Sequence, residues 1–235
     1  MTYQATRHER PRFPGVTNIT RPSTGVGSFA PDPWMAIDGS FTCLGVWNAK
    51  GAASYAASLV NQASPGINDA VAGTVASPNW DTSWGWIFTG QCLVVPRMNA
   101  TKSIFVRFNG GPASSANRLI GSAQYPDTGN RFWILPSYSA ATNYQGISAG
   151  ATIATAVTSG IVGIAGFACW RDGVKGATLA SFNGDTLNLL GIGGQYEGGT
   201  SVRYALTCNV QCVWMYSTIL DDAQSAQVCA AMAAY

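Results

Sequence analysis

The chain has 235 residues, with 13 basic and 11 acidic side chains, and 47% of its residues are apolar. This composition excludes extensive disorder, because aromatic and aliphatic side chains occur throughout. The net charge of +2 gives no support for nucleic-acid binding. There is one histidine, His8, and there are two glutamates, Glu9 and Glu197. The side chains that most often perform general acid–base catalysis are therefore scarce, and we expect that the protein is not an enzyme.

Residues 1–40 form a region of distinct composition. Five of the eleven prolines and four arginines fall there, and proline favours extended, polyproline-like backbone. One interpretation is a solvated tail. The interpretation that we favour is an arm that becomes ordered on a neighbouring subunit, because a solvated tail would not require its large apolar side chains. The residues expected to anchor this assembly arm are Arg7, Arg10, Arg12, Phe13, Arg21, Phe29 and Trp34.

From Phe41 onward, short β-prone runs alternate with turn residues, which is typical of an all-β sandwich. Asp172-Gly173 supplies the positive φ values of a tight hairpin. The predicted strand segments are 85–95, 102–108, 118–123, 131–135, 161–170, 186–192 and 202–216, and the last is long enough for two strands or one bent strand.

Two stretches are predicted to be helical, residues 52–60 and residues 221–234. At the start of the second, Asp221 is a suitable N-cap and Gln224 stands three residues on, as in a capping box. Val228 and Met232 fall on one side of this helix, and we expect that side to dock on the sandwich.

Six cysteines are spread singly through apolar segments. Cys208 and Cys212 are four residues apart, which on a regular strand places them on the same face about 13 Å apart, too far for a disulfide. No CxxC pair or Cys/His cluster occurs, so we expect no zinc site. Asp69, Asp81 and Asp127 stand singly, whereas calcium needs several oxygen ligands. We therefore expect reduced thiols, no metal and no cofactor.

Three stretches together resemble a known family. They are residues 50–66, Trp80-Asp81 with residues 85–90, and residues 213–224, whose sequence VWMYSTILDDAQ contains the pattern apolar-Tyr-x-x-x-Leu-x-Asp-Ala. They are similar to the laminin-G-like, concanavalin A-like jelly-roll domains of phage and bacterial surface proteins, in which this pattern joins a strand to a helix. The resemblance covers residues 45–235. It implies two antiparallel sheets packed face to face, with a concave side that such domains often use for glycans or partners.

The predicted organisation is therefore an extended arm at residues 1–40, followed by a domain at residues 41–235. The domain is expected to be an antiparallel two-sheet jelly-roll sandwich with a short C-terminal helix. Glycosidases that resemble it carry a Glu-x-Asp-x-x-Glu cluster. Neither Glu9 nor Glu197 stands in such a setting, so the pair of carboxylates that hydrolysis needs is missing, and no catalytic residue is assigned.

Aromatic side chains provide the candidate glycan-binding residues. Trp80, Trp84 and Trp86 are the densest aromatic group, and the resemblance implies that Trp80 and Trp86 pack in the core. Trp84 is the candidate surface aromatic. The tyrosines of turn-rich segments suit polar recognition, although packing at the rim is the alternative for them. The candidate glycan-binding residues are Trp84, Tyr125 and Tyr144.

The function that we expect from these features is a non-enzymatic structural protein of a virion, as a capsid decoration or a tail component. Its arm would hold neighbouring copies or other virion proteins in a homo-oligomer, without nucleic-acid or membrane partners. The alternative is a glycan-binding adhesion module for host surfaces. A hydrolase or lyase is a third hypothesis, kept only because the expected fold permits it. We expect no signal peptide, and residues 158–170 are too short to span a bilayer. The expected location is the virion, after synthesis in the host cytoplasm.

Overall fold

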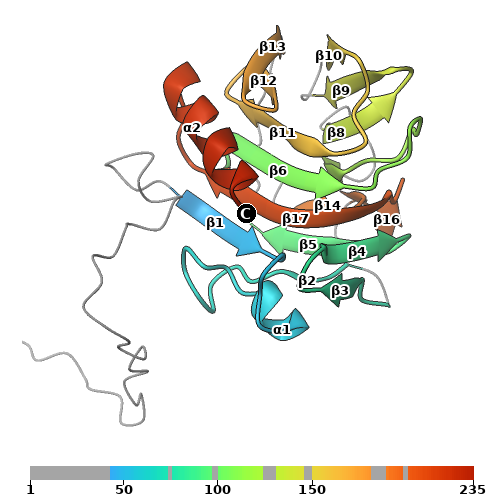
Figure 1. Ribbon diagram of the computed structural model, residues 1–235, viewed down its shortest axis with the longest axis vertical. Coiled ribbons are helices and arrows are strands. Elements are labelled where there is room, and N and C mark those ends of the chain that lie inside the picture. The colour runs from blue at the N-terminus through green and yellow to red at the C-terminus, as the bar shows by residue number, and fades with distance from the viewer. Residues whose placement is uncertain are drawn as a thin grey trace, which may run out of the picture. The chain divides into compact units, whose positions relative to one another are not determined.

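The computed structural model describes residues 43–73, 76–96, 100–123, 131–145, 150–180, 189–197 and 201–235. They form two antiparallel sheets packed as a β-sandwich, with a twelve-residue helix, α2 (Asp222–Ala233), near the C-terminus (Figure 1). The predicted fold class, an all-β sandwich with a short C-terminal helix, is therefore confirmed.

Sheet A contains eight strands among the described residues. Its central strands are β6 (Ser103–Asn109) and β17 (Thr207–Tyr216), which pair with each other. Along its other side, the long β17 pairs with β4 (Gly85–Thr89) in its first half and with β1 (Cys43–Asn48) in its second half. In spatial order the strands are β13 (Val174–Thr178), β12 (Ala168–Arg171), β11 (Gly160–Ala165), β6, β17, β4 and β3 (Asn79–Asp81), and β1 pairs with β17 outside this order.

Sheet B contains nine strands among the described residues. Apart from the parallel pairing of β15 (Gln195–Glu197) with β7 (Ile120–Ala123), its strand pairings are antiparallel. In spatial order the strands are β10 (Gly150–Ala154), β9 (Ala141–Gln145), β8 (Arg131–Tyr138), β7 (Ile120–Ala123), β14 (Leu189–Ile192), β5 (Leu93–Pro96) and β2 (Val71–Ala72), and β15 (Gln195–Glu197) pairs with β7 and with β16 (Ser201–Arg203).

Strand alternation explains the core between the sheets. Successive side chains of a strand point to opposite faces. On β6, Ile104 and Val106 therefore belong to the cluster between the sheets, whereas Phe105 belongs to a second cluster on the outer face of sheet A. Trp86 is fully buried in the core and Trp80 packs against it, which confirms the prediction for both tryptophans.

Helix α2 covers the outer face of sheet A. Its Val228 and Met232 are fully buried, and they belong to the same cluster as Phe105 and Trp214 of the sheet. This confirms the predicted docking side. At the C-terminal end of α2, the Arg107 guanidinium donates hydrogen bonds to the carbonyl oxygens of residues 232 and 233, at 2.6 and 3.0 Å. A cation at this end also interacts favourably with the negative end of the helix dipole.

The predicted capping box at the start of α2 is present. The Asp221 carboxylate accepts a hydrogen bond from the Gln224 backbone N–H at 2.8 Å, and the Gln224 side chain accepts one from the Asp221 N–H at 2.9 Å. The other predicted helix is shorter than expected: α1 spans only Tyr55–Ser58. The Ser54 hydroxyl caps it by accepting from the Ala57 N–H at 3.1 Å, so the helix begins after Ser54 rather than at residue 52.

Three predicted strand segments each divide into two strands. Residues 85–95 contain β4 in sheet A and β5 in sheet B, separated by Gly90 with a φ of 114°. Residues 161–170 contain β11 and β12, joined at Gly166 with a φ of 56°. Residues 202–216 contain the end of β16 and all of β17. The predicted Asp172-Gly173 turn is present between β12 and β13, with φ values of 49° and 80°.

A β-bulge corrects the prediction for two cysteines. The register between β17 and β6 shifts between Val210 and Cys212, which adds one residue to β17 and reverses the alternation. Cys208 therefore lies in the core, whereas Cys212 lies in the cluster beneath α2. The expectation of a shared face was wrong. All six cysteines are free thiols, as predicted.

The helices among the described residues are α1 and α2. Neither of these helices is long and apolar enough to cross a bilayer.

Candidate functional site

Two of the sequence-predicted site residues, Trp84 and Tyr144, lie among the residues that the structure describes. The arm residues Arg7, Arg10, Arg12, Phe13, Arg21, Phe29 and Trp34 and the loop residue Tyr125 lie outside the described residues. The boundary at residue 40 lies there too. The assembly arm and its partners therefore stay a prediction.

Trp84 and Tyr144, the other two glycan-binding candidates, lie in opposite environments. Trp84 lies in the turn between β3 and β4 and is 48% exposed. Tyr144 is 0% exposed, and its hydroxyl donates a hydrogen bond to the Trp170 carbonyl oxygen at 2.7 Å. The prediction for Tyr144 is wrong, because on β9 this residue faces the core and its polar atom is already bonded. Trp84 remains a candidate.

A different group of polar and aromatic side chains lies on the outer face of sheet B. Its members lie on β8, β15 and β16, just before β7 and just after β16. We call it the arginine–aromatic cluster, and its members are Arg118, Arg131, Trp133, Gln195, Glu197, Arg203 and Tyr204.

The alternation of side chains along β8 explains why two members of the cluster, Arg131 and Trp133, lie on the outer face. Phe132 and Ile134 belong to the core, so Arg131 and Trp133 face outward. Trp133 is paired in register with Gly121 of β7, and Gln195 of β15 is paired with the same glycine. A Cβ atom at Gly121 would lie 3.2 Å from the Cβ of Gln195. The absence of a side chain there lets β15 approach β7 closely.

Arg118 lies just before β7 and is held by two aromatic rings. Its guanidinium carbon is 3.6 Å from the centroid of the Tyr204 ring and 5.3 Å from that of the Trp133 ring. Both distances allow cation–π attraction. The Arg118 backbone N–H also donates to the Tyr204 carbonyl oxygen at 2.8 Å. Tyr204 has a φ of 54°, a region that residues other than glycine enter rarely and with strain. The fold thus holds a strained residue directly against the arginine.

The acid of the cluster is Glu197, which is 7% exposed. Its carboxylate accepts a hydrogen bond from the Gln195 amide at 2.8 Å and forms an ion pair with Arg203 Nε at 2.9 Å. These two contacts offset the cost of burying the charge. The cluster as a whole contains three guanidinium groups and one carboxylate, so it carries excess positive charge.

Arg118 is the most unusual titratable group of the cluster. Burial lowers its pKa, and the nearby Arg131 acts in the same direction, while Tyr204 and Glu197 raise it. The Tyr204 side chain forms a hydrogen bond with this guanidinium, but its buried Nε and Nη1 atoms have no hydrogen-bond partner among the described residues. A buried donor without an acceptor is costly, more so when it is charged. An anionic ligand atom would remove this cost.

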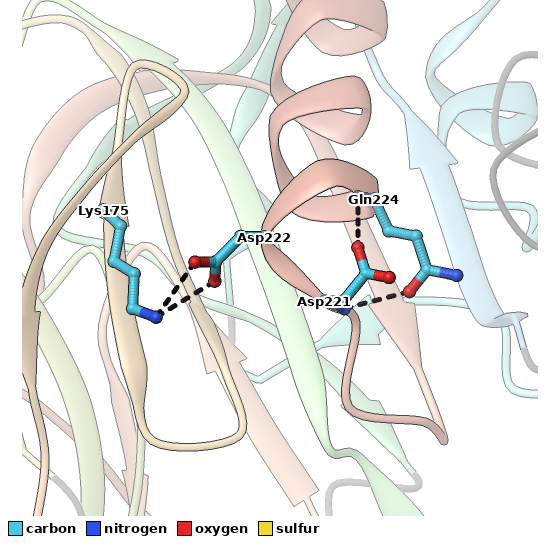
Figure 2. A network of polar contacts seen from close by, with 4 residues as sticks. All are labelled: Lys175, Asp221, Asp222 and Gln224. Atoms are coloured by element: carbon cyan, nitrogen blue, oxygen red, sulfur yellow. Dashed lines mark hydrogen bonds and ion pairs between the residues drawn. The ribbon is translucent and has the colours of Figure 1, made fainter.

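A hollow of about 630 Å³ lies elsewhere, at the N-terminal end of α2. Two large apolar side chains line it and are half-exposed, Phe167 at 49% and Ile219 at 60%. On its rim, Lys175 Nζ forms an ion pair with Asp222 at 3.0 Å, next to the capping box of Asp221 and Gln224 (Figure 2). Figure 2 shows the Lys175 side chain extending from its strand toward the first turn of the helix.

The described residues contain no group of three or more His, Cys, Asp or Glu side chains that could hold a metal ion. Burial raises the pKa of the Cys92, Cys169, Cys208 and Cys212 thiols to about 12. These thiols are therefore protonated at neutral pH and poor nucleophiles.

Sequence reasoning missed the arginine–aromatic cluster, because its members come from three separate segments. One local signal was available. Arg131-Phe132-Trp133 lies in a predicted strand, and alternation alone places the arginine and the tryptophan on the same face. The contribution of Arg118 and Tyr204 depends on a register that the sequence does not reveal.

No protein-family model matches the sequence, and no curated protein matches it. The structure is similar to solved sialidases. Trypanosoma rangeli sialidase in complex with sialic acid has a TM-score of 0.53 and 14% identity, over 80% of this chain and 32% of that chain. The covalent intermediate of the same enzyme with 2,3-difluorosialic acid has a TM-score of 0.53 and 13% identity, over the same shares.

A carbohydrate-binding module, the CBM40 of Ruminococcus gnavus IT-sialidase, has a TM-score of 0.46 and 14% identity, over 56% of this chain and 84% of that chain. At these identities the likeness concerns the fold alone. The chain spans about a third of the length of the Trypanosoma enzyme. The comparison with the Trypanosoma enzyme therefore agrees with the β-sandwich that the sequence resemblance implied.

Proposed function

We propose that this domain is a glycan-binding module that holds an acidic sugar on the outer face of sheet B, at the arginine–aromatic cluster. The observation that carries the proposal is Arg118, whose guanidinium lies against two aromatic rings with two buried donors that lack an acceptor among the described residues. The excess of guanidinium groups over carboxylates favours an anion.

The chemistry of the cluster suits a sugar acid. Guanidinium groups bind carboxylates through paired, charge-assisted hydrogen bonds. Aromatic rings offer an apolar surface for the ring face of a sugar. The Tyr204 ring covers the Arg118 guanidinium and is itself 46% exposed. Binding therefore displaces this ring, and the sugar takes its place against the arginine.

Binding rather than catalysis is the role that the cluster supports. Glycoside hydrolysis commonly uses two carboxyl groups on either side of the scissile bond. The cluster contains one, Glu197, and it is engaged by Gln195 and Arg203. A solved protein of similar fold, the Trypanosoma rangeli sialidase, was determined with sialic acid, a sugar that carries a carboxylate. Sialosides are therefore the first ligands to test.

Two other expectations from the sequence, the glycan-binding role of Trp84 and the virion role, do not involve this cluster. Trp84 is an exposed aromatic at another place in the fold, in the turn between strands of sheet A, and it offers a second position for glycan binding. The virion role, with its arm and its homo-oligomer, stays a prediction that the described residues do not address.

The test is titration calorimetry with sialyllactose, with lactose as the neutral control sugar. We expect binding of sialyllactose and at least tenfold weaker binding of lactose. Arg118→Gln should weaken sialyllactose binding by about ten- to hundredfold, because a hydrogen bond to a charged group contributes about 1.5–3 kcal/mol. Lys50→Gln removes the same charge from the end of β1 and should leave affinity unchanged.

Two outcomes would contradict the proposal. The first is that the folded protein binds no glycan on an array of acidic glycans. The second is sialyllactose binding that survives Arg118→Gln but is lost in Trp84→Ala, which would move the glycan site to the turn between β3 and β4. Thermal unfolding of each variant confirms that it is folded before binding is measured.

A further inference from the structure

Gln195 is a deeply buried polar residue of the arginine–aromatic cluster, with an exposed fraction of 2%. Its side-chain nitrogen donates a hydrogen bond to the Glu197 carboxylate at 2.8 Å. Its side-chain oxygen is buried and has no hydrogen-bond partner among the described residues. A buried acceptor without a donor is costly, and native structures contain few such atoms. The Gln195 oxygen is therefore a second feature of the cluster, besides the Arg118 donors, that a ligand would satisfy.

The neighbours of Gln195 fix the orientation of its amide. An ionised carboxylate only accepts hydrogen bonds, so the Gln195 nitrogen must face Glu197 and the oxygen must point away from it. Glu197 is held in turn by its ion pair with Arg203 at 2.9 Å, and Arg203 is paired in register with Gln195 across β15 and β16. These contacts leave the Gln195 oxygen available to a donor from outside the cluster.

Gln195 and Trp133 lie on either side of the same glycine. Both are paired in register with Gly121 of β7, one from each neighbouring strand. Two strand spacings of about 4.8 Å therefore separate their Cα atoms by about 10 Å. Trp133 Nε1 is also buried without a hydrogen-bond partner among the described residues. The row thus contains an unpaired acceptor at one end and an unpaired donor at the other, with no side chain at Gly121 between them.

Arg118 adjoins this row. Its guanidinium carbon is 5.3 Å from the centroid of the Trp133 ring. The Tyr204 ring that covers the guanidinium belongs to the residue directly after Arg203, which is the register partner of Gln195. The displacement of this ring, which binding at Arg118 requires, therefore takes place beside Gln195. An acid group held by Arg118 lies next to groups that can bind the rest of the same sugar.

We infer that Gln195 is a specificity-determining residue of the glycan site. Its side-chain oxygen accepts a hydrogen bond from a hydroxyl group or an amide N–H of the same sugar whose carboxylate is held by Arg118. The inference rests on the glycan-binding role proposed above and narrows the ligand class to acidic sugars that carry a donor near the acid group. A site built to hydrogen-bond a polar group rejects the analogue that lacks it, because the buried atom of the site is then left unpaired.

The test is titration calorimetry with methyl α-sialoside and with analogues that each lack one donor. In these analogues one hydroxyl group is replaced by hydrogen, or the amide N–H is methylated. For the wild type, removal of the donor that faces Gln195 should weaken binding about three- to tenfold. Gln195→Met replaces the amide by an apolar chain of similar length, so the parent sugar and that analogue should then bind within about twofold of each other. Gln62→Met makes the same substitution beside β1 and should keep the wild-type pattern.

Glu197→Gln is a second variant that tests the orientation of the amide. Its new side chain offers N–H groups to the Gln195 oxygen, which then no longer needs a donor from the sugar. This variant should also bring the parent sugar and the same analogue within about twofold of each other. The ratio of the two affinities is the readout, because a general change in charge or stability affects both ligands alike. Thermal unfolding confirms that each variant is folded.

Two results would overturn the inference. One is sialoside binding that requires Arg118 but in which every analogue keeps its wild-type loss in both Gln195→Met and Glu197→Gln. The glycan-binding role would then stand, and Gln195 would have no part in specificity. The other is the absence of sialoside binding to the wild type, which would remove the proposed function and this inference together.

Discussion

The outer face of sheet A and the outer face of sheet B follow the same strand alternation but carry different side chains. On sheet A, the outward residues include Phe105 and Trp214, and helix α2 buries them with Val228 and Met232. On sheet B, the outward residues of β8 are Arg131 and Trp133, in a cluster of charged groups. One face is therefore a second hydrophobic core, and the other is a polar surface.

This difference shows which face is available to a ligand. A face that is apolar and closed by a helix contributes to stability through burial. A face that places a strained tyrosine on a half-buried arginine lacks such a closed apolar layer, and strained residues of this kind cluster at binding and active sites. The comparison predicts that mutations beneath α2 affect mainly unfolding, and that mutations in the arginine–aromatic cluster affect mainly binding.

The largest effect is expected for Trp214→Ala. The Trp214 ring is fully buried, its Nε1 donates a hydrogen bond to the Asn48 side chain at 2.9 Å, and it meets the Tyr235 ring edge-on at 6.0 Å between centroids. Removing such a side chain lowers the free energy of unfolding by about 3–5 kcal/mol. Urea unfolding monitored by circular dichroism measures the loss.

Trp133→Ala is the matched control on the other face. Trp133 is only partly buried, so its removal should lower the free energy of unfolding by about 1–2 kcal/mol and should weaken sialyllactose binding. If both variants lose the same stability, the outer face of sheet B is as structural as that of sheet A, and the comparison fails.

The second prediction concerns alkaline pH and the thiols beneath α2. Burial raises the pKa of Cys212 from 9.0 to about 12. Below pH 9 the thiol is protonated in both the folded and the unfolded chain, so it adds no pH dependence. Between pH 9 and pH 12 only the unfolded chain loses the proton. This thiol therefore lowers the free energy of unfolding by about 1.4 kcal/mol per pH unit in that window.

Cys212→Ala should flatten the pH dependence of unfolding by this amount per unit. The measurement is a series of urea unfolding curves between pH 8 and pH 11 for the wild type and the variant. Parallel pH profiles would show that the space beneath α2 admits water, in contrast to a closed second core.

Much of the fold could be predicted because it depends on local signals. The capping box of Asp221 and Gln224 marked the start of α2, and Asp172-Gly173 marked a hairpin, since both depend on residues close in sequence. The bulge in β17 could not be predicted in this way. Nothing near Gln211 signals an extra residue, and one such insertion reverses the faces of all later side chains.

The candidate site was harder to predict than the fold. Trp84 was correctly expected at the surface, because it departs from the core pattern of its neighbours. Tyr144 was misplaced, since its turn-rich surroundings concealed a strand that faces the core. Arg118 and Tyr204 are 86 positions apart and meet through a parallel bridge beside β7. Contacts of this kind follow from tertiary register, which a single sequence does not specify.

The smallest effect separates the cap of α2 from its packing on sheet A. Asp221→Ala removes the side chain that accepts from the Gln224 N–H and should lower the free energy of unfolding by about 1 kcal/mol. Asp221→Asn keeps an acceptor there and should recover most of the loss. Asp222→Ala removes only an ion pair whose partners are 46% and 67% exposed, and such pairs contribute about 0.2–1 kcal/mol. Thermal unfolding of the three variants measures these losses, and we expect the largest for Asp221→Ala. If Asp221→Ala costs as much as Trp214→Ala, the helix depends on its cap rather than on the second core, and the contrast between the two faces would need another cause.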